Sequence, residues 1–439
     1  MNKRGMFISN EPDFFAIPLL FLLTIIVLSL TITPSAVFCN SWQPIGPEGG
    51  NFIFSMTNPM NANEVTVITT SPSPSNVYRS TDGGISWNKI GEIPYPYIND
   101  VSSFDFSTIY AITSSRCYRS IDGGESWTVA SLPSSTGWAY RICADPIDSS
   151  KVYAAGYFSD YQSYPYTYSM VFFKSIDGGL SWSTSSFFTF DAFYPYDMAI
   201  SKSNPSVMYV SGYKEVSNDY FGALLQTIDG GSTWTDISSS VNTDSFSFLE
   251  CVAIDPTDEN KVYVGGSVFY RSIREGRGRE LSWERSSTRI NCYTIDIDPV
   301  DPSRIYSGGY QSISVSTDYG QTWRTYNGCT RNWIQNIEVA PADPSRIYAS
   351  SNTGLYRSQD SGATWSPAHE GIYAARIAAL AAAPSTVIVQ NSGYLMEYSR
   401  MGRATTWHDL VTPESCGEVC DILINPDDPD IVLVLEGYG

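Results

Sequence analysis

Histidine and basic residues are scarce in this chain of 439 residues. Two histidines cannot supply a histidine-rich metal site, and they argue against a Ser-His-Asp triad. Lysine and arginine number 26 against 45 aspartates and glutamates, which gives a net charge of −19. Such a surface repels phosphate groups, so the composition disfavours nucleic acid and anionic membranes as partners. No zinc-ligand spacing and no Gly-x-Ser-x-Gly motif is present, and we expect no metal and no cofactor.

Long apolar runs are absent after residue 40. Before it, Lys3 and Arg4 precede an apolar stretch at residues 14–33, and the tract ends at Val37-Phe38-Cys39. This order is typical of an export signal, here residues 1–39, and predicts an exported protein that is periplasmic, on the cell surface or extracellular. The run is nearly long enough to span a bilayer, so an uncleaved anchor at residues 14–33 is the alternative. Membrane contact is expected only through that segment.

An eight-residue tract, Ser-x-Asp-Gly-Gly-x-Ser/Thr-Trp, returns along nearly the whole chain. Six copies are clear, and eroded copies run over residues 272–283 and 399–407. The tryptophans that end the copies are 40 to 55 residues apart. A period of this size indicates one supersecondary unit stacked repeatedly. The aspartates of the clear copies are Asp82, Asp122, Asp177, Asp229, Asp318 and Asp360.

Around each tract, the sequence predicts four short strands with alternating apolar residues, separated by turns rich in Pro, Asp and Gly. Residues 337–341, 346–350 and 354–358 are examples of the first three strands. Four strands in about 40 residues indicate a blade of a β-propeller. We therefore expect an all-β protein in which residues 40–439 form a single large propeller of eight or nine four-stranded blades, with seven also allowed. Residues 42–45 and 422–435 would close the ring, and the last blade is incomplete if strand C is missing.

The repeated aspartate has a structural explanation. Its carboxylate can accept hydrogen bonds from backbone N–H groups a few residues on, while glycine supplies the positive φ of a tight turn. A residue needed once for chemistry would not recur in every blade. These tracts resemble the Asp-box (BNR) repeats of sialidases, sortilin-type receptors, xyloglucan-active glycoside hydrolases and photosystem II assembly factors. The resemblance covers roughly residues 42–437, and it implies that the boxes lie on the face away from a ligand.

The cysteines suggest two bridges in an exported chain. Cys292 and Cys329 lie 9 and 6 residues after Trp283 and Trp323, so they occupy equivalent loops of neighbouring repeats. We predict a Cys292–Cys329 bridge and a small Cys416–Cys420 loop. Seven cysteines follow Cys39, so an odd thiol is left over.

The loops at the end opposite the boxes differ between repeats and concentrate aromatic residues. Tyrosines held by proline-stiffened loops suit stacking on sugar rings or contact with a protein, although long loops also pack on their own aromatic residues. The predicted partner is therefore a glycan or a protein. The candidate ligand-binding residues are Tyr157, Tyr161, Tyr164, Tyr166, Tyr194, Tyr196 and Tyr220.

Catalysis has no recognisable motif here. A glycosidase needs two carboxylates about 5 to 9.5 Å apart, and several acidic residues lie on or near the aromatic end. The sialidase Arg-Ile-Pro tract has only an echo, Tyr140-Arg141-Ile142-Cys143, so no sialidase residue is carried over. We interpret the chain as an exported, non-catalytic binding or scaffold module. A glycoside hydrolase, xyloglucanase-like or sialidase-like, and an assembly factor for a membrane complex are the alternatives. The acidic residues are Asp160, Asp191, Asp197, Asp219 and Glu250.

Overall fold

The computed structural model separates the chain into two compact units, residues 48–376 and residues 1–47 with 377–439. It describes residues 49–437 except 71–73, 96, 134–136, 161–166, 191, 217–218, 242–247, 274–280, 328–332, 375–376, 384–385, 392–393, 402–403, 411–417 and 425–431. The predicted export signal and anchor at residues 1–39 lie outside the described residues. No helix among the described residues has the length and apolarity to cross a membrane.

Residues 49–374 form seven antiparallel sheets of four strands, each in the order of the chain, and this arrangement confirms the predicted propeller of four-stranded blades. The first three blades are β2 (Phe52–Asn58), β3 (Asn61–Thr69), β4 (Ser75–Ser80), β5 (Asn88–Ile93); β6 (Asp100–Ser103), β7 (Ile109–Ile112), β8 (Arg116–Ser120), β9 (Thr128–Ser131); and β10 (Trp138–Ala144), β11 (Val152–Asp160), β12 (Thr167–Ser175), β13 (Ser183–Phe190).

The other four blades follow in the order of the chain. A short helix, α2 (Ser238–Val241), comes after the fourth. Their strands are β14 (Ala192–Ile200), β15 (Met208–Val216), β16 (Asp219–Thr227), β17 (Thr235–Asp236); β18 (Leu249–Asp255), β19 (Asp258–Gly266), β20 (Tyr270–Ile273), β21 (Ser282–Arg285); β22 (Thr294–Ile297), β23 (Ile305–Gly308), β24 (Ser312–Ser316), β25 (Arg324–Asn327); and β26 (Ile334–Val339), β27 (Ile347–Ser351), β28 (Leu355–Ser358), β29 (Ser366–Pro367).

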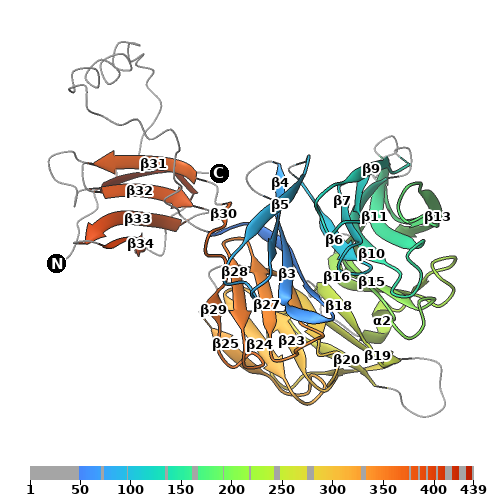
Figure 1. The fold of residues 1–439 in the computed structure, drawn as a ribbon. Helices are drawn as coiled ribbons and strands as arrows, with labels where there is room; N and C mark the ends of the chain where they lie inside the picture. Colours follow the sequence, from blue (N-terminus) through green and yellow to red (C-terminus); the bar gives the residue numbers. More distant parts are fainter. Residues whose placement is uncertain are drawn as a thin grey trace, which may run out of the picture. The chain divides into compact units, whose positions relative to one another are not determined.

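The seven blades close into a ring, because β2 of the first blade packs against β26 of the seventh (Figure 1). The Ser55 backbone N–H donates to Asn336 Oδ1 at 3.0 Å, and the Trp87 indole donates to the Ala368 carbonyl at 2.8 Å. A parallel pair, β1 (Gly49–Gly50) with β30 (Tyr373–Ala374), joins the two ends of this unit. Closure therefore occurs within residues 49–374. The expectation that the first and last strands of the chain close the ring is wrong.

The blade number is seven, the lowest number that the repeats allowed. The eighth repeat forms a four-stranded sheet of the other unit, followed by a two-stranded sheet. Both sheets are antiparallel in chain order, and β31 packs against β35. Their strands are β31 (Ile377–Ala383), β32 (Thr386–Asn391), β33 (Tyr394–Met401), β34 (Ala404–Leu410), β35 (Glu418–Ile424) and β36 (Val432–Gly437).

The apolar core of the propeller lies between adjacent blades. The second strand of each of six blades carries a buried tyrosine after an apolar residue, as in Ile347-Tyr348. The ring of Tyr348 lies under Gly84, in the box of the next blade, so that an added Cβ would lie 3.4 Å from it. The box glycines Gly179 and Gly362 face the equivalent tyrosines of the preceding blades, Tyr110 and Tyr306. Box turns and second strands thus pack together at these three junctions.

The six clear boxes have nearly the same hydrogen bonds. In the third blade, Asp177 Oδ1 accepts from the Ser181 backbone N–H at 2.8 Å, and Oδ2 accepts from the Ser181 hydroxyl at 2.6 Å. The Ser175 hydroxyl donates to Asp177 Oδ1 at 2.8 Å. The Gly178 N–H also donates to the Ser150 carbonyl, in the turn between the first two strands of the blade. The boxes and these turns therefore share one end of the propeller.

Candidate functional site

The end opposite the boxes is shaped by a β-bulge near the start of the first strand of several blades. The pairing register skips one residue in β2, β10, β14, β18 and β26. A bulge changes the direction in which the side chains around it point. The skipped residues are Ile53, Tyr140, Tyr196, Glu250 and Gln335.

In the second and sixth blades, the equivalent residues stand directly before the first strand. Asn99 precedes β6, and Tyr293 precedes β22. Each of the seven blades therefore supplies one side chain at the same place around the axis, and these side chains are of five types: isoleucine, asparagine, tyrosine, glutamate and glutamine. All except Tyr140 line a pocket of about 360 Å³, to which all seven blades contribute. We call it the axial pocket, and its other lining residues are Asp100, Arg141, Asp197, Thr294, Trp333 and Ile334.

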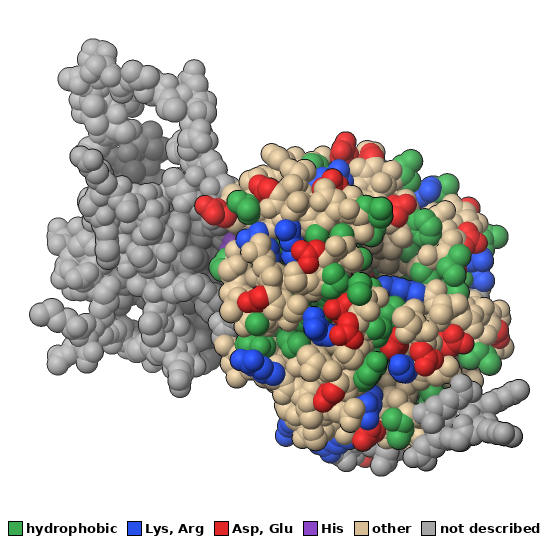
Figure 2. Space-filling view, turned by 60° about the horizontal axis from the view of Figure 1, so that its bottom comes forward, with side chains coloured by type: hydrophobic (Ala, Val, Ile, Leu, Met, Phe, Trp, Pro, Cys, Tyr) green, Lys and Arg blue, Asp and Glu red, His purple; other side chains and the backbone are tan. Residues whose placement is uncertain are grey.

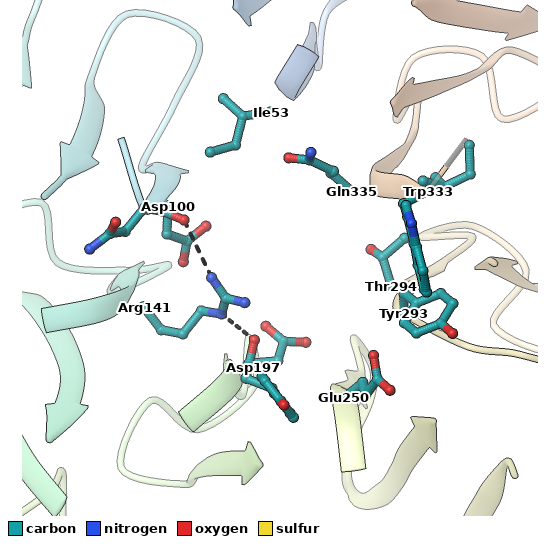
Figure 3. A pocket seen from close by; sticks show the side chains of 12 residues that line it. Ile53, Asp100, Arg141, Asp197, Glu250, Tyr293, Thr294, Trp333 and Gln335 are labelled. Carbon is teal, nitrogen blue, oxygen red and sulfur yellow. Dashed lines mark hydrogen bonds between the residues drawn. The ribbon is translucent and has the colours of Figure 1, made fainter. Parts of the chain in front are cut away.

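Figure 3 shows that the axial pocket has two dissimilar walls. Arg141 lies between Asp100 and Asp197 on one side, and Glu250 lies near Tyr293, Thr294 and Trp333 on the other. The Tyr293 and Trp333 rings meet edge to face, with centroids 4.4 Å apart, and Trp333 is 41% exposed.

The charged residues of the first wall hold adjacent blades together. The Ile142 N–H donates to Asp100 Oδ2 at 3.0 Å, and the Val252 N–H donates to Asp197 Oδ2 at 2.9 Å. Arg141 donates to the Tyr196 carbonyl in the next blade and to the Asn99 carbonyl in the preceding one. These bonds satisfy backbone groups on the edges of the first strands that the blades' own ladders leave unpaired. The three side chains are therefore committed to the fold.

Both oxygens of each carboxylate of this wall accept a backbone hydrogen bond. The second oxygens, Asp100 Oδ1 and Asp197 Oδ1, accept from the backbone N–H groups of Val101 and Met198 at 2.8 Å. Loss of water around Asp197 raises the pKa of its carboxyl to about 6, although the nearby Arg141 guanidinium opposes the shift. Burial raises the pKa of Asp100 in the same way.

Glu250 differs from these residues. Within the described part of the chain, its carboxyl has no hydrogen bond and no ion pair, although the residue is half-buried. Loss of hydration raises the pKa of Glu250 to about 7, and no charged partner opposes the shift. Glu250 is therefore the ionisable group of the axial pocket that stays available for a ligand.

An aromatic row leads from the axial pocket across the third, fourth and fifth blades. Neighbouring rings lie with centroids 4.8 to 6.4 Å apart, as in the stacked pair Tyr194–Tyr213 at 4.8 Å. The rings are half-buried, apart from the more exposed Trp138. The row therefore packs on itself and still presents ring surface to solvent. Its members are Trp138, Tyr140, Tyr157, Tyr194, Tyr196, Tyr213, Tyr220 and Phe248.

Four of the seven predicted tyrosines, Tyr157, Tyr194, Tyr196 and Tyr220, are in this row. Tyr161, Tyr164 and Tyr166 lie outside the described residues, as do Asp191 and the side chain of Asp160. Asp219 is exposed at the start of β16, whereas Asp197 and Glu250 both line the axial pocket, on different walls. Sequence reasoning missed Arg141 as a lining residue and, with it, Asn99, Asp100, Tyr293, Trp333 and Gln335.

The cysteines meet in a pair that the sequence did not suggest. Cys251 Sγ and Cys292 Sγ are 3.0 Å apart across the junction of the fifth and sixth blades, and both side chains are buried and free. Cys329 and Cys416 lie outside the described residues, and so does the side chain of Cys420. The predicted Cys292–Cys329 and Cys416–Cys420 bridges therefore remain predictions.

A second pocket opens around the axis among the turns between first and second strands, at the end that carries the boxes. Its lining includes Lys202, Asp296 and Glu338. Glu338 Oε1 accepts from the Thr57 backbone N–H at 3.1 Å, across the junction that closes the ring. Burial, reinforced by the charge of Asp296, raises the pKa of Glu338 to about 8. On the face that Figure 2 presents, acidic and basic side chains are interspersed.

The repeats and the ring of blades define the class of protein, a β-propeller of Asp-box repeats. Residues 78–89 match the family model described as BNR/Asp-box repeat. No curated protein matches the sequence.

Three solved structures similar to this one are propellers of low sequence identity. The structure of the Niastella koreensis GH74 enzyme has a TM-score of 0.57 at 15% identity, over 89% of this chain and 70% of that one. The structure of an ancestral GH74 enzyme has a TM-score of 0.58 at 15% identity, over 90% of this chain and 67% of that one. The structure of YCF48 bound to D1 peptide has a TM-score of 0.50 at 15% identity, over 71% of this chain and 94% of that one. At this identity, the similarity establishes the fold alone.

Proposed function

We propose that this protein is an exported, non-catalytic binding module whose ligand, a glycan or a protein, lies across the axial pocket and the aromatic row. The observation that carries the proposal is the division between the two ends. The boxes repeat the same contacts, whereas the side chains that the blades present to the axial pocket vary in size, polarity and charge. In repeat proteins, recognition is placed where the units differ.

A glycoside hydrolase is the alternative, because two of the similar structures are GH74 enzymes. The axial pocket argues against this alternative. A glycosidase uses a pair of carboxyl groups that can exchange protons or attack the sugar. Asp100 and Asp197 each accept backbone N–H bonds on both oxygens, which leaves Glu250 as the available carboxyl among the described lining residues.

An assembly factor for a membrane complex is the second alternative from the sequence. YCF48, one of the similar propellers, has been solved with a bound D1 peptide. The same binding end would serve such a role, with the apolar segment at residues 14–33 retained as an anchor. Membrane fractionation of the native protein separates this alternative from a freely exported module.

The proposal is tested by a glycan array and a peptide array probed with the parent protein and with Tyr157→Ala/Tyr196→Ala. Each lost ring contact with the ligand is expected to weaken binding by about 1 kcal/mol, while the double variant stays folded. Tyr319→Ala, in the box of the sixth blade, is the matched control and is expected to bind like the parent. The proposal is contradicted if the parent binds nothing on both arrays, or if it releases sugar from xyloglucan or a sialoside.

A further inference from the structure

We propose that the axial pocket binds a cationic side chain, lysine or arginine, of an extended peptide, and that Glu250 is its counter-ion. This inference rests on the proposed function, since it names the ligand class of the same site. It starts from the contrast within the axial pocket: Asp100, Arg141 and Asp197 are held by neighbouring blades, and Glu250 is not.

The position of Glu250 suits a ligand. It is the residue that the bulge in β18 leaves unpaired in the ladder, between Leu249 and Cys251, and a bulge changes the direction in which such a side chain points. A carboxylate that loses water without gaining a partner is costly, and a cationic ligand would recover that cost by forming a charge-assisted hydrogen bond.

The wall around Glu250 also fits a cation. Tyr293 and Trp333 line the axial pocket beside it, and the Tyr310 ring lies 5.1 Å from that of Trp333. Ring faces attract lysine and arginine, most strongly where water is excluded. Thr294 and Gln335 add neutral polar groups. An uncharged sugar would gain the ring contacts but would leave the carboxylate without a counter-charge.

The remaining charges favour the same sign of ligand. Arg141 stands between Asp100 and Asp197, and its charge opposes the rise in pKa that burial causes at both carboxyls. The single positive charge of Arg141 thus faces two carboxyl groups, and Glu250 adds a third carboxyl group to the axial pocket. The net charge of −19 over the whole chain draws cations toward the protein from a distance.

The test uses isothermal titration with an N-acetylated, C-amidated peptide of alternating glycine and lysine. The parent protein is expected to bind it, and the same peptide with acetylated lysines is expected to bind at least about tenfold more weakly. Glu250→Gln, which keeps the shape of the side chain, should cause a loss of the same size. Glu370→Gln removes an equal charge from an exposed position and should have little effect.

Trp333→Leu provides a second variant in case Glu250→Gln fails to fold, and it should weaken binding several-fold through the lost ring face. Equal affinity of parent and Glu250→Gln would overturn the inference. If the parent binds glycans or other peptides on the arrays but not the lysine peptide, the inference fails and the proposed function stands. If it binds nothing, both fail.

A different observation leads to a second inference: we propose that Cys251 and Cys292 form a disulfide that links the fifth and sixth blades, which excludes the predicted Cys292–Cys329 bridge. Cys251 occupies the position in its blade that Asp197 and Asn336 occupy in theirs, directly after the skipped residue. Those two side chains accept a backbone N–H from the next blade. At the junction of the fifth and sixth blades, the cysteine pair takes the place of that bond.

Space for the pair is reserved by a glycine. A Cβ added to Gly265 would lie 2.4 Å from Cys292 Sγ and 3.0 Å from Cys251 Sγ. The bridge forms by thiol–disulfide exchange with a small disulfide such as oxidised glutathione. Both thiols lose a proton, the S–S bond forms, and the reagent leaves as two thiols. Because both side chains are buried in the folded chain, exchange is expected during folding.

The experiment folds the protein in a glutathione redox buffer, alkylates the remaining thiols under denaturing conditions and maps the peptides by mass spectrometry. A cross-linked Cys251–Cys292 peptide is the expected result, together with a higher melting temperature than in the reduced protein. Cys251→Ser/Cys292→Ser should melt at the same temperature with and without reductant, provided that it folds. Complete alkylation of Cys251 and Cys292 in the parent would overturn the inference.

Discussion

The carboxylates of the box turns and those around the axis differ in their pKa values although both sets belong to the same propeller. Asp177 is exposed and accepts several hydrogen bonds; the Ser181 hydroxyl contributes most, and together they hold its pKa at about 2. Asp197 and Glu338 lie around the axis, where burial raises their pKa values to about 6 and about 8. The difference shows that the surroundings of a carboxyl group, and not its residue type, determine its role.

The two sets also differ in how they repeat. Box aspartates recur with the same partners from blade to blade, as comparison of Asp177 and Asp360 shows. Around the axis, the acids alternate with arginine, cysteine and neutral residues. A repeated contact stabilises the unit that carries it, whereas a varied position can take part in recognition. The variants below test this separation, beginning with the largest expected effect.

Gly231→Ala is expected to cause the largest loss of stability. Gly231 has φ +83°, and an added Cβ would lie 2.1 Å from the Phe172 ring in the preceding blade. Strain and overpacking should together cost about 2 to 4 kcal/mol in urea denaturation. Gly230→Ala in the same box is the control: its φ is +70°, but no atom lies within 4 Å. It should cost only about 1 kcal/mol. Equal losses would show that the boxes do not pack between blades.

Asp177→Ala is expected to cost about 1 to 2 kcal/mol, because the turn loses its acceptor, and to leave ligand binding unchanged. The folded-state pKa of about 2 lies below the ordinary value of 3.8. The contribution of Asp177 is therefore present above pH 3.8 and is lost as the pH falls toward 2. Acid titration of the melting temperature should show a smaller decrease for the variant than for the parent. Loss of binding at an unchanged melting temperature would contradict the structural role.

Much of the fold was predictable because eight repeats carry the same local sequence pattern. Strand order, the turn at each box and the end on which the boxes lie all follow from local patterns. The blade number did not follow, because the eighth repeat is eroded in the same way as the fifth, and the fifth belongs to the ring. Which repeat closes the ring depends on the packing of Phe52 and its neighbours against the seventh blade, and sequence spacing does not report this.

The axial pocket was less predictable. A signal for the bulges exists, since the buried residues Ile334 and Ile337 are three apart where a regular strand would space them by two. That break identifies Gln335 and, by alignment, Glu250. The roles of Asp100 and Asp197 could not be predicted, because their partners are backbone groups 42 and 55 residues away in the next blade.

Glu338→Gln should give the smallest effect at pH 5, where the folded parent keeps this carboxyl protonated, and the sign of its pH dependence distinguishes the two sets of carboxylates. The pKa of about 8 lies above the ordinary 4.5, so between these values the folded protein keeps a proton that the unfolded chain releases. Stability conferred by the protonated group therefore falls as the pH rises from 4.5 to 8, opposite to the change at Asp177. Asp296, whose pKa is raised to about 6, adds to this fall, and Lys202 opposes it.

Glutamine at position 338 keeps the acceptor for Thr57 without the charge. Urea denaturation at pH 5 and pH 8 should show a smaller decrease in stability in the variant than in the parent. Glu370→Gln should follow the parent. An equal decrease in Glu338→Gln and the parent would mean that the carboxyl groups around the axis are ionised like those of the boxes.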